Sequence, residues 1–305
     1  MAIDIRKISK LGLGGLKDFD PSINQQQQIE AVTYTLNQGV SYAEVTMWYS
    51  EGHAAEILAQ SIAASKKDRE EIFLSQAIYE YDHPTFETID NELIDLHHIF
   101  ETDYSDAITL PMNSFNKYGF DKVCNWLDKK IINGQTRYVS TTNADKEFLE
   151  LLHKRFGDKL FAHEVHINFE IREMERLKII ATADKFGVRN VIAQPLRRNR
   201  TALHEWPLLT EIAKKYNATQ NQIILAWMVA RNFLPLIKST NTKHINENLG
   251  ALEILLEDSG IVRINNWLPN YKLPEIDWHN TGVGVTPHQL ANVFDDDYKE
   301  QMKAK

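Results

Sequence analysis

The feature of this sequence that most restricts its fold is a regular alternation of short apolar runs with helical patterns. Seven of the runs begin near Val40, Glu71, Ser105, Thr136, Ala162, Val188 and Pro235. An eighth run, residues 8–13, precedes them. Most runs are separated by roughly the 30 residues that a strand–helix–strand unit takes. Eight strands alternating with helices predict an α/β fold of the (β/α)8 type, a TIM barrel.

An open, doubly wound sheet is the main alternative. Such a sheet usually has fewer strands, and a glycine-rich turn of the form GxGxxG follows its first strand. Here the first run ends in GLGG, at residues 12–15, and no amphipathic helix follows directly. We therefore predict a turn at this point, and the barrel is favoured.

The helical patterns place apolar residues on one face at intervals of three and four residues. In the clearest case the apolar set follows Thr85, a suitable N-cap residue. That set is Phe86, Ile89, Leu93 and Leu96. The same spacing predicts three further helices, whose apolar sets are Ile29, Val32 and Leu36; Ile223, Ala226, Trp227 and Ala230, after Thr219; and Ile245, Leu249, Leu252 and Leu256.

The alternation stops near Gly260, and the composition of the chain changes there. Residues 267–305 contain Pro269, Pro274 and Pro287 together with several aromatic residues. We predict a barrel domain over residues 1–260 and an irregular tail over residues 261–305 that packs on the barrel. The tail either covers the mouth of the barrel or closes an apolar patch.

Charge and cysteine content limit the partners of the chain. Its 34 lysine and arginine residues and 42 aspartate and glutamate residues give a formal net charge of −8, which argues against nucleic acids and anionic membranes as partners. No apolar run approaches the ~18 residues of a membrane span, and residues 1–8 lack the apolar region of a signal peptide. A single cysteine, Cys124, rules out an internal disulfide and favours a reducing, cytoplasmic location.

Four motifs in the right order resemble those of the aldo-keto reductase family, over residues 8–257. They are GVSYAEVTMWYSEGHAAEIL at 39–58, DYSDAIT at 103–109, GQTRYVSTTN at 134–143 and KSTNTKHINENL at 238–249. The resemblance implies a TIM barrel that transfers a hydride from NADPH to a small carbonyl substrate. In the family a tyrosine donates the proton, a lysine paired with an aspartate lowers the pKa of that tyrosine, and a histidine orients the carbonyl group.

Carried over to this chain, the resemblance implies a degraded catalytic tetrad. Tyr49 matches the tyrosine, and Glu44 takes the aspartate position with one more methylene group. Gln76 is predicted at the lysine position and Pro111 at the histidine position. Neither replacement supplies a charge or an imidazole donor. Gln76 is instead expected to hydrogen-bond Tyr49.

The family's cofactor-binding positions are partly kept. Thr142 and Asn143 match the residues that hold the nicotinamide carboxamide, and Glu164 replaces a glutamine there. The clamp for the 2′-phosphate of adenosine keeps a lysine and two hydroxyl groups, but a histidine replaces its arginine. The resemblance places the clamp and the adenine contacts at Lys238, Ser239, Thr240, His244, Glu247 and Asn248.

Other polar residues allow additional hypotheses. Glu164 and His166 lie two apart on a predicted strand, so they share a face and form a candidate acid–base pair or a structural pair. His163 and His166 lie on opposite faces, and we expect no metal site. A cluster of arginines after the seventh strand is a candidate phosphate site or a solvated loop; its members are Arg197, Arg198 and Arg200.

Together these observations predict an NADP(H)-dependent oxidoreductase for a small carbonyl compound, with altered or impaired catalysis. The alternative is a catalytically silent barrel that binds a nucleotide or another ligand. A third hypothesis is a different enzyme that uses Glu164 and His166 in the same pocket.

Overall fold

The structure is a computed structural model that describes residues 2–14, 24–80, 83–199 and 201–267. Within these residues, eight parallel strands form a closed barrel in sequence order, because β1 pairs with both β2 and β8. The strands are β1 (Gly12–Leu13), β2 (Tyr42–Val45), β3 (Phe73–Ala77), β4 (Ser105–Pro111), β5 (Thr136–Thr142), β6 (Leu160–His166), β7 (Arg189–Ala193) and β8 (Leu234–Ile237). The predicted (β/α)8 barrel is confirmed.

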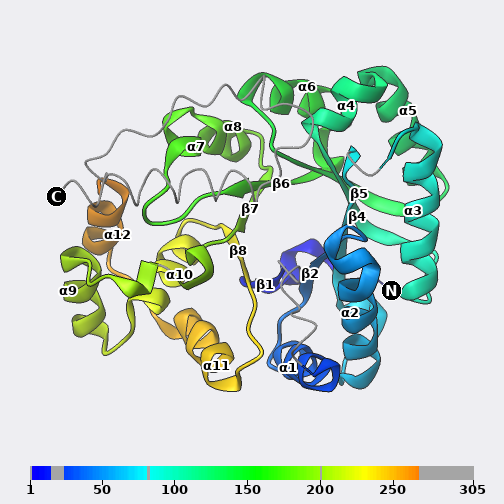
Figure 1. Cartoon of the computed structure of the whole chain (residues 1–305). Coiled ribbons are helices and arrows are strands. Elements are labelled where there is room, and N and C mark those ends of the chain that lie inside the picture. The colour runs from blue at the N-terminus through cyan, green and yellow to red at the C-terminus, as the bar shows by residue number, and fades with distance from the viewer. Residues whose placement is uncertain (1, 15–23, 81–82, 200, 268–305) are drawn as a thin grey trace.

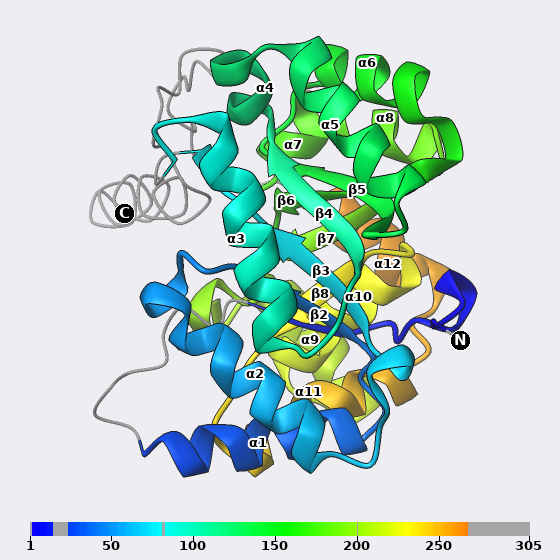
Figure 2. The same ribbon diagram turned by 90° about the vertical axis from the view of Figure 1, so that its right-hand side faces the viewer.

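Helices surround the barrel on the outside (Figure 1). In the view of Figure 2, α2 and α3 pack against each other across one side of it. The α-helices of the described residues are α1 (Gln25–Asn37), α2 (His53–Ala64), α3 (Phe86–Ile99), α4 (Met112–Tyr118), α5 (Phe120–Ile132), α6 (Lys146–Phe156), α7 (Glu173–Arg176), α8 (Ile179–Lys185), α9 (Pro207–Tyr216), α10 (Gln220–Ala230), α11 (Thr242–Gly250) and α12 (Asp258–Asn265).

Two helices show how the sequence sets their ends and their buried faces. In α3, all four residues of the predicted apolar set are buried, and Thr85 is the N-cap residue in an extended conformation. In α10, Thr219 and Gln222 form a capping box: the Thr219 hydroxyl accepts from Gln222 N, and Gln222 Oε1 accepts from Thr219 N. These contacts satisfy backbone N–H groups that a helix start otherwise leaves without a partner.

An aromatic layer fills the amino-terminal half of the barrel interior. Its rings belong to Tyr42, Phe73, Tyr138 and Phe161, and the Phe73 and Phe161 centroids lie 4.5 Å apart. The layer also explains the glycine of β1. A Cβ atom at Gly12 would lie 2.7 Å from both Tyr42 Cδ1 and Leu234 Cδ2, so a larger residue does not fit there.

A polar layer follows directly above the aromatic one. Side chains of a strand alternate between its two faces, so residues two apart point the same way. Glu44 therefore follows Tyr42 into the interior, Ser75 follows Phe73, and Ser140 follows Tyr138. This layer lies toward the carboxyl ends of the strands, where active sites of TIM barrels are found.

Three predictions differ from the structure in detail or fall outside it. The predicted helix through Leu252 and Leu256 is wrong in its second half, because α11 ends at Gly250 and Leu252 is 40% exposed. The predicted boundary at residue 260 falls inside α12, and most of the predicted tail, residues 268–305, lies outside the described residues. No helix in the described part of the chain has the length and apolar character to cross a membrane.

Candidate active site

Two carboxyl groups from opposite sides of the barrel meet in the polar layer. Glu44 on β2 is 2% exposed and Glu164 on β6 is 6% exposed, and their side chains are hydrogen-bonded to each other. Strands β2 and β6 are separated by three strands in either direction around the barrel. The contact therefore crosses the interior, and we call this pair the Glu44–Glu164 dyad.

Burial and mutual repulsion raise the pKa values of the dyad. Burial raises the pKa of Glu44, and the hydrogen bond with Glu164 acts in the opposite direction. The pKa of Glu164 is raised well above its ordinary value, first by burial, then by the negative charge of Glu44 and by the hydrogen bond between them. The loss of a first proton therefore leaves the two carboxyl groups with one proton between them.

Three oxygen atoms near the dyad have no hydrogen-bond partner among the described residues. They are Glu44 Oε2, Ser140 Oγ and Thr142 Oγ1, and each belongs to a side chain at most 2% exposed. Thr142 pairs with Glu164 across β5 and β6, so its hydroxyl lies next to the dyad. Buried polar atoms without a partner are rare in native proteins and often mark sites for water or a ligand.

The structure corrects the role predicted for Gln76. Its neighbour Ser75 lies beside Glu44 and hydrogen-bonds Thr109, so Ser75 faces the interior and Gln76 faces the surrounding helices. Gln76 Oε1 accepts from the hydroxyl of Ser105, which also contacts His97 Nε2 of α3 at 2.9 Å. Gln76 therefore does not face the barrel interior.

Ala77 is the residue of β3 that shares the face of Glu44 at the carboxyl end of the strand. Its methyl group carries no charge and no polar atom. Pro111 ends β4, two positions after the interior residue Thr109. The interior ends of β3 and β4 thus supply neither a cation nor an imidazole ring.

Tyr49 lies in a short 3-10 turn, η3 (Tyr49–Gly52), that connects β2 to α2. The structure thus puts its backbone at the carboxyl end of β2, on the side of the barrel that carries the dyad. The Tyr49 side chain lies outside what the structure describes. Its predicted catalytic role remains a prediction.

The predicted cofactor residues collect at the same end of the barrel. Thr142 ends β5, and Asn143 follows it with a left-handed backbone, φ 54°. Lys238, Ser239 and Thr240 follow β8 and precede α11, which carries the other three predicted residues. Among those three, Asn248 is buried, Glu247 accepts a hydrogen bond from the Thr219 hydroxyl at 2.7 Å, and His244 is exposed, with its Nδ1 3.6 Å from Glu247 Oε2.

The predicted phosphate site after β7 is not supported at Arg197. This side chain is 5% exposed, and its guanidinium forms an ion pair with Glu170. Glu170 also accepts a hydrogen bond from the Thr201 hydroxyl at 2.7 Å. Arg197 thus neutralises a buried carboxylate instead of facing a phosphate. Arg200 and the Arg198 side chain lie outside the described residues.

The two histidines of β6 have different surroundings. Desolvation lowers the pKa of His163 to about 3, and His163 Nε2 accepts from Ala144 N at 3.3 Å. A cavity of about 20 Å³ beside it has room for one water molecule. His166 is 5% exposed and shares the face of Glu164, but the carboxyl partner of Glu164 is Glu44. The described residues contain no group of three His, Cys, Asp or Glu side chains placed to hold a metal ion.

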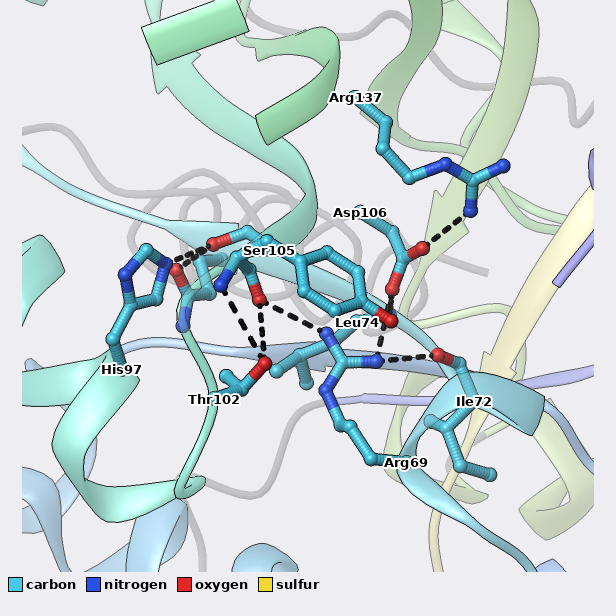
Figure 3. Close-up of polar contacts among 10 residues, drawn as sticks. Arg69, Ile72, Leu74, His97, Thr102, Ser105, Asp106 and Arg137 are labelled. Carbon is cyan, nitrogen blue, oxygen red and sulfur yellow. Dashed lines mark hydrogen bonds and ion pairs between the residues drawn. The ribbon is translucent and has the colours of Figure 1, made fainter. Parts of the chain in front are cut away.

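Another buried carboxylate, Asp106, lies near the amino-terminal end of β4 and was not identified from the sequence. It is fully buried, and Arg69 and Arg137 contact it at 3.0 Å and 2.6 Å (Figure 3). The backbone N–H of Leu74 also donates to it, at 3.0 Å. Its motif, DYSDAIT, marks the strand, but only the fold brings these two arginines to it.

Comparison with known proteins points to one family. A sequence model of the aldo/keto reductase family matches residues 10–268. Methylglyoxal reductase YeaE of Escherichia coli is 20% identical over 250 residues, which cover 80% of this chain and 86% of the relative. The NADP-dependent D-sorbitol-6-phosphate dehydrogenase of Malus domestica is 25% identical over 285 residues, which cover 82% of this chain and 89% of that protein.

Solved structures agree with the observed fold. The thermostable aldo-keto reductase Tm1743, in complex with the inhibitor epalrestat, superposes with a TM-score of 0.74 and 25% identity, covering 85% of this chain and 94% of that one. An aldo/keto reductase from Klebsiella pneumoniae in complex with NADP and acetate gives a TM-score of 0.74 at 19% identity, covering 85% of this chain and 90% of that one.

Proposed function

The chain belongs to the aldo/keto reductase family, and we propose that it is an NADP(H)-dependent oxidoreductase that interconverts a small carbonyl compound and its alcohol through an altered proton-transfer system. The observation that carries the proposal is the Glu44–Glu164 dyad. In the family pattern, the acidic residue at position 44 pairs with a lysine. Here Ala77 supplies no cation, and Glu44 is hydrogen-bonded to a second carboxyl group instead.

The residues at the carboxyl ends of β5 and β8 fit a dinucleotide cofactor. Thr142 Oγ1 is buried without a partner, and Asn143 follows it at the strand end. Lys238, Ser239 and Thr240 precede the amino-terminal end of α11, where a phosphate group is favoured by the lysine charge and the helix dipole. NADP(H), when bound, supplies or accepts the hydride. A relative named as NADP-dependent and structures that contain NADP or NADPH support this choice of cofactor.

The loss of the cation and the imidazole has a chemical consequence for Tyr49. A phenol has an ordinary pKa near 10, and a nearby cation favours its ionised form. Ala77 and Pro111 provide no such cation. We therefore expect slow reduction of generic aldehydes by the native protein, because a well-tuned proton donor is typically worth about 10²–10⁴-fold in rate.

A catalytically silent ligand-binding barrel is the second candidate. The residues that favour it are the same Ala77 and Pro111, which leave the tetrad incomplete. The retained polar residues after β5 and β8 are consistent with binding in either case. The two candidates differ in turnover and agree on cofactor binding.

The experiment that tests the proposal measures binding and turnover separately. Calorimetric titration with NADPH and NADH tests whether the site after β8 binds the cofactor, with Lys238→Ala as the variant that weakens NADPH. Oxidation of NADPH with a panel of small aldehydes, and reduction of NADP⁺ with small alcohols, tests for chemistry. Binding without turnover in either direction would favour the silent barrel, and absence of binding would refute the cofactor assignment.

Two further proposals concern the domain organisation and the cellular location of the protein. We propose that the chain forms one barrel domain followed by a carboxyl-terminal tail, with the boundary after α12 and not at residue 260. We further propose a cytoplasmic location, because the sequence has a single cysteine, Cys124, which is free. Limited proteolysis and localisation of a tagged chain test these two points.

A further inference from the structure

The Glu44–Glu164 dyad is a buried acid pair, and its two members cannot both be ionised easily. Both side chains are buried, and they are in hydrogen-bond contact. Two carboxylates in such contact repel each other strongly, so the pair retains one proton between them. The hydrogen bond then runs from the protonated carboxyl group to the ionised one.

The surroundings of the dyad contain few groups that can change its charge. The interior residues of β3, β4 and β5 near it have no ionisable side chains: they are Ser75, Ala77, Thr109, Ser140 and Thr142. Titratable or charged residues on the interior faces of the surrounding described strands are Tyr42 on β2, His166 on β6 and Arg189 on β7, and Lys238 follows the interior residue Leu236 of β8 by two positions. Arg189 acts mainly on the Tyr42 phenol, whose pKa is raised well above its ordinary value by burial and then by Glu44.

The dyad also has an open acceptor. Glu44 Oε2 has no partner among the described residues, although its side chain is 2% exposed. Burial raises the pKa of both carboxyl groups, so the pair keeps one proton, and Glu44 Oε2 is the acceptor that it leaves open. Ser140 Oγ and Thr142 Oγ1, also without partners, lie on the neighbouring interior surface. An ionised oxygen in this position requires a hydrogen-bond donor from a ligand or a water.

We propose that Glu44 is the general base of this pocket, that it accepts the hydroxyl proton of an uncharged alcohol substrate at Oε2, and that Glu164 is a positioning residue that holds the shared proton. This inference rests on the proposed oxidoreductase function and deepens it. It assigns the acid–base role to a pair of residues on opposite strands and specifies the class of substrate.

The O–H bond of the alcohol breaks, and its proton moves to Glu44 Oε2. The C–H bond at the carbinol carbon breaks, and the hydride passes to the oxidised nicotinamide dinucleotide, so that the alcohol is oxidised to a carbonyl compound. The dyad is then neutral and returns to its starting state by releasing one proton to solvent.

The charge of the dyad determines which protonation step it can perform and which substrates it repels. With one proton for two carboxyl groups, the dyad has a net charge of −1 and is in the form that accepts a proton. Oxidation of the alcohol is therefore the reaction that this protonation state supports. The same negative charge repels a substrate carboxylate or phosphate, so the substrate is an uncharged alcohol.

A first experiment needs neither cofactor nor turnover. Infrared difference spectroscopy of the cofactor-free protein follows the carbonyl stretch of protonated carboxylic acids through a pH titration. We expect one protonated buried carboxyl group at neutral pH that disappears in Glu164→Gln, and that titrates at lower pH in Glu44→Gln. The control is Glu80→Gln, which removes another buried carboxyl group and should keep the signal. Absence of a protonated carboxyl group at neutral pH would overturn the inference.

A second experiment measures NADP⁺-dependent oxidation of cyclohexanol against pH. Glu44→Gln should lower kcat by about 10²–10⁴-fold, the typical worth of a general base, with little change in NADP⁺ affinity. Glu164→Gln should lower kcat less, because its amide still donates a hydrogen bond to Glu44. In this variant, the rate should still fall at acidic pH. The change in rate at alkaline pH that belongs to ionisation of Glu164 should be absent.

The outcomes separate this inference from the proposed function. Turnover that is equally insensitive to Glu44→Gln and Glu164→Gln would leave an NADP(H)-dependent enzyme but overturn the dyad as its base. A larger loss in Glu164→Gln than in Glu44→Gln would overturn the assignment of roles. Failure of the native protein to bind a dinucleotide or to oxidise any small alcohol would overturn both.

Discussion

Buried carboxyl groups at the two ends of the barrel differ in whether positive charges lie beside them. Near the amino-terminal end, Asp106 lies between Arg69 and Arg137 and accepts a backbone hydrogen bond, so its charge is compensated (Figure 3). Toward the carboxyl-terminal end, Glu44 contacts Glu164, and the interior residues of β3 to β5 beside them carry no charge. The first arrangement stabilises the fold. The second opposes ionisation, which is typical of functional sites.

The largest effect is expected from Asp106→Ala. This change leaves two arginines beside an uncharged residue and should lower the free energy of unfolding by about 3–5 kcal/mol. Urea denaturation measures it. The control is Asp128→Ala, which breaks the more exposed pair with Arg155 and should cost no more than about 1 kcal/mol. Equal losses would show that Asp106 does not have the structural role assigned to it.

A cation introduced at the carboxyl-terminal end should remove the contrast between the two ends. Ala77→Lys with Pro111→His supplies a charge beside Glu44 and an imidazole at the end of β4. We expect the rate of NADPH-dependent aldehyde reduction to rise by about 10–100-fold. This corresponds to an activation free energy lower by about 1.4–2.7 kcal/mol. Each single change should do less, because such residues act as a unit.

Two controls sharpen that experiment. Gln76→Lys with Pro111→His should bring no gain, because position 76 faces Ser105 and α3 instead of the interior. Adding Tyr49→Phe to the successful variant should abolish the gain if the lysine acts through the tyrosine hydroxyl. A gain at position 76 and none at position 77 would reverse our assignment of the interior face of β3.

Glu164→Gln should change the pH dependence of stability. The folded-state pKa of Glu164 is raised, so its favourable contribution is present below the ordinary pKa of glutamate, about 4.5, and is lost as pH rises through the folded-state pKa. The variant should therefore be more stable than the native protein under alkaline conditions, by about 1.4 kcal/mol for each unit of the raised pKa. The double variant with Glu44→Gln should gain less than the sum of the two single changes. A variant that is less stable than the native protein at alkaline pH would contradict the proton-sharing dyad.

The smallest effect is expected from His244→Arg. An arginine at the start of α11 should bind the 2′-phosphate of NADPH with a fixed charge and tighten NADPH by tenfold at most, about 1.4 kcal/mol, with little effect on NADH. Fluorescence titration with both cofactors measures it. His98→Arg, which adds the same charge on exposed α3, should change neither affinity. An equal improvement for NADH would mean that position 244 does not contact the phosphate.

Several local features could be predicted from the sequence, because the information for them lies within a few residues. The spacing of Phe86, Ile89, Leu93 and Leu96 defines the buried face of α3, and Thr219 with Gln222 defines the start of α10. The order of eight strand–helix units defines the barrel. The predicted polar residues collect at one end because all strands are parallel and each motif lies at the end of its strand.

Other features depend on contacts that only the closed barrel creates. The pairing of β3 with its neighbouring strands shows that Ala77, and not Gln76, faces the interior. The four family motifs did not place this strand accurately enough to distinguish two adjacent residues. The partner of Arg197 is Glu170, on a different loop, and the arginines of Asp106 come from segments before β3 and on β5. Glu44 and Glu164 lie on strands that do not pair, so no local pattern links them. Closure of the barrel brings the two carboxyl groups into contact, and burial there raises the pKa of both.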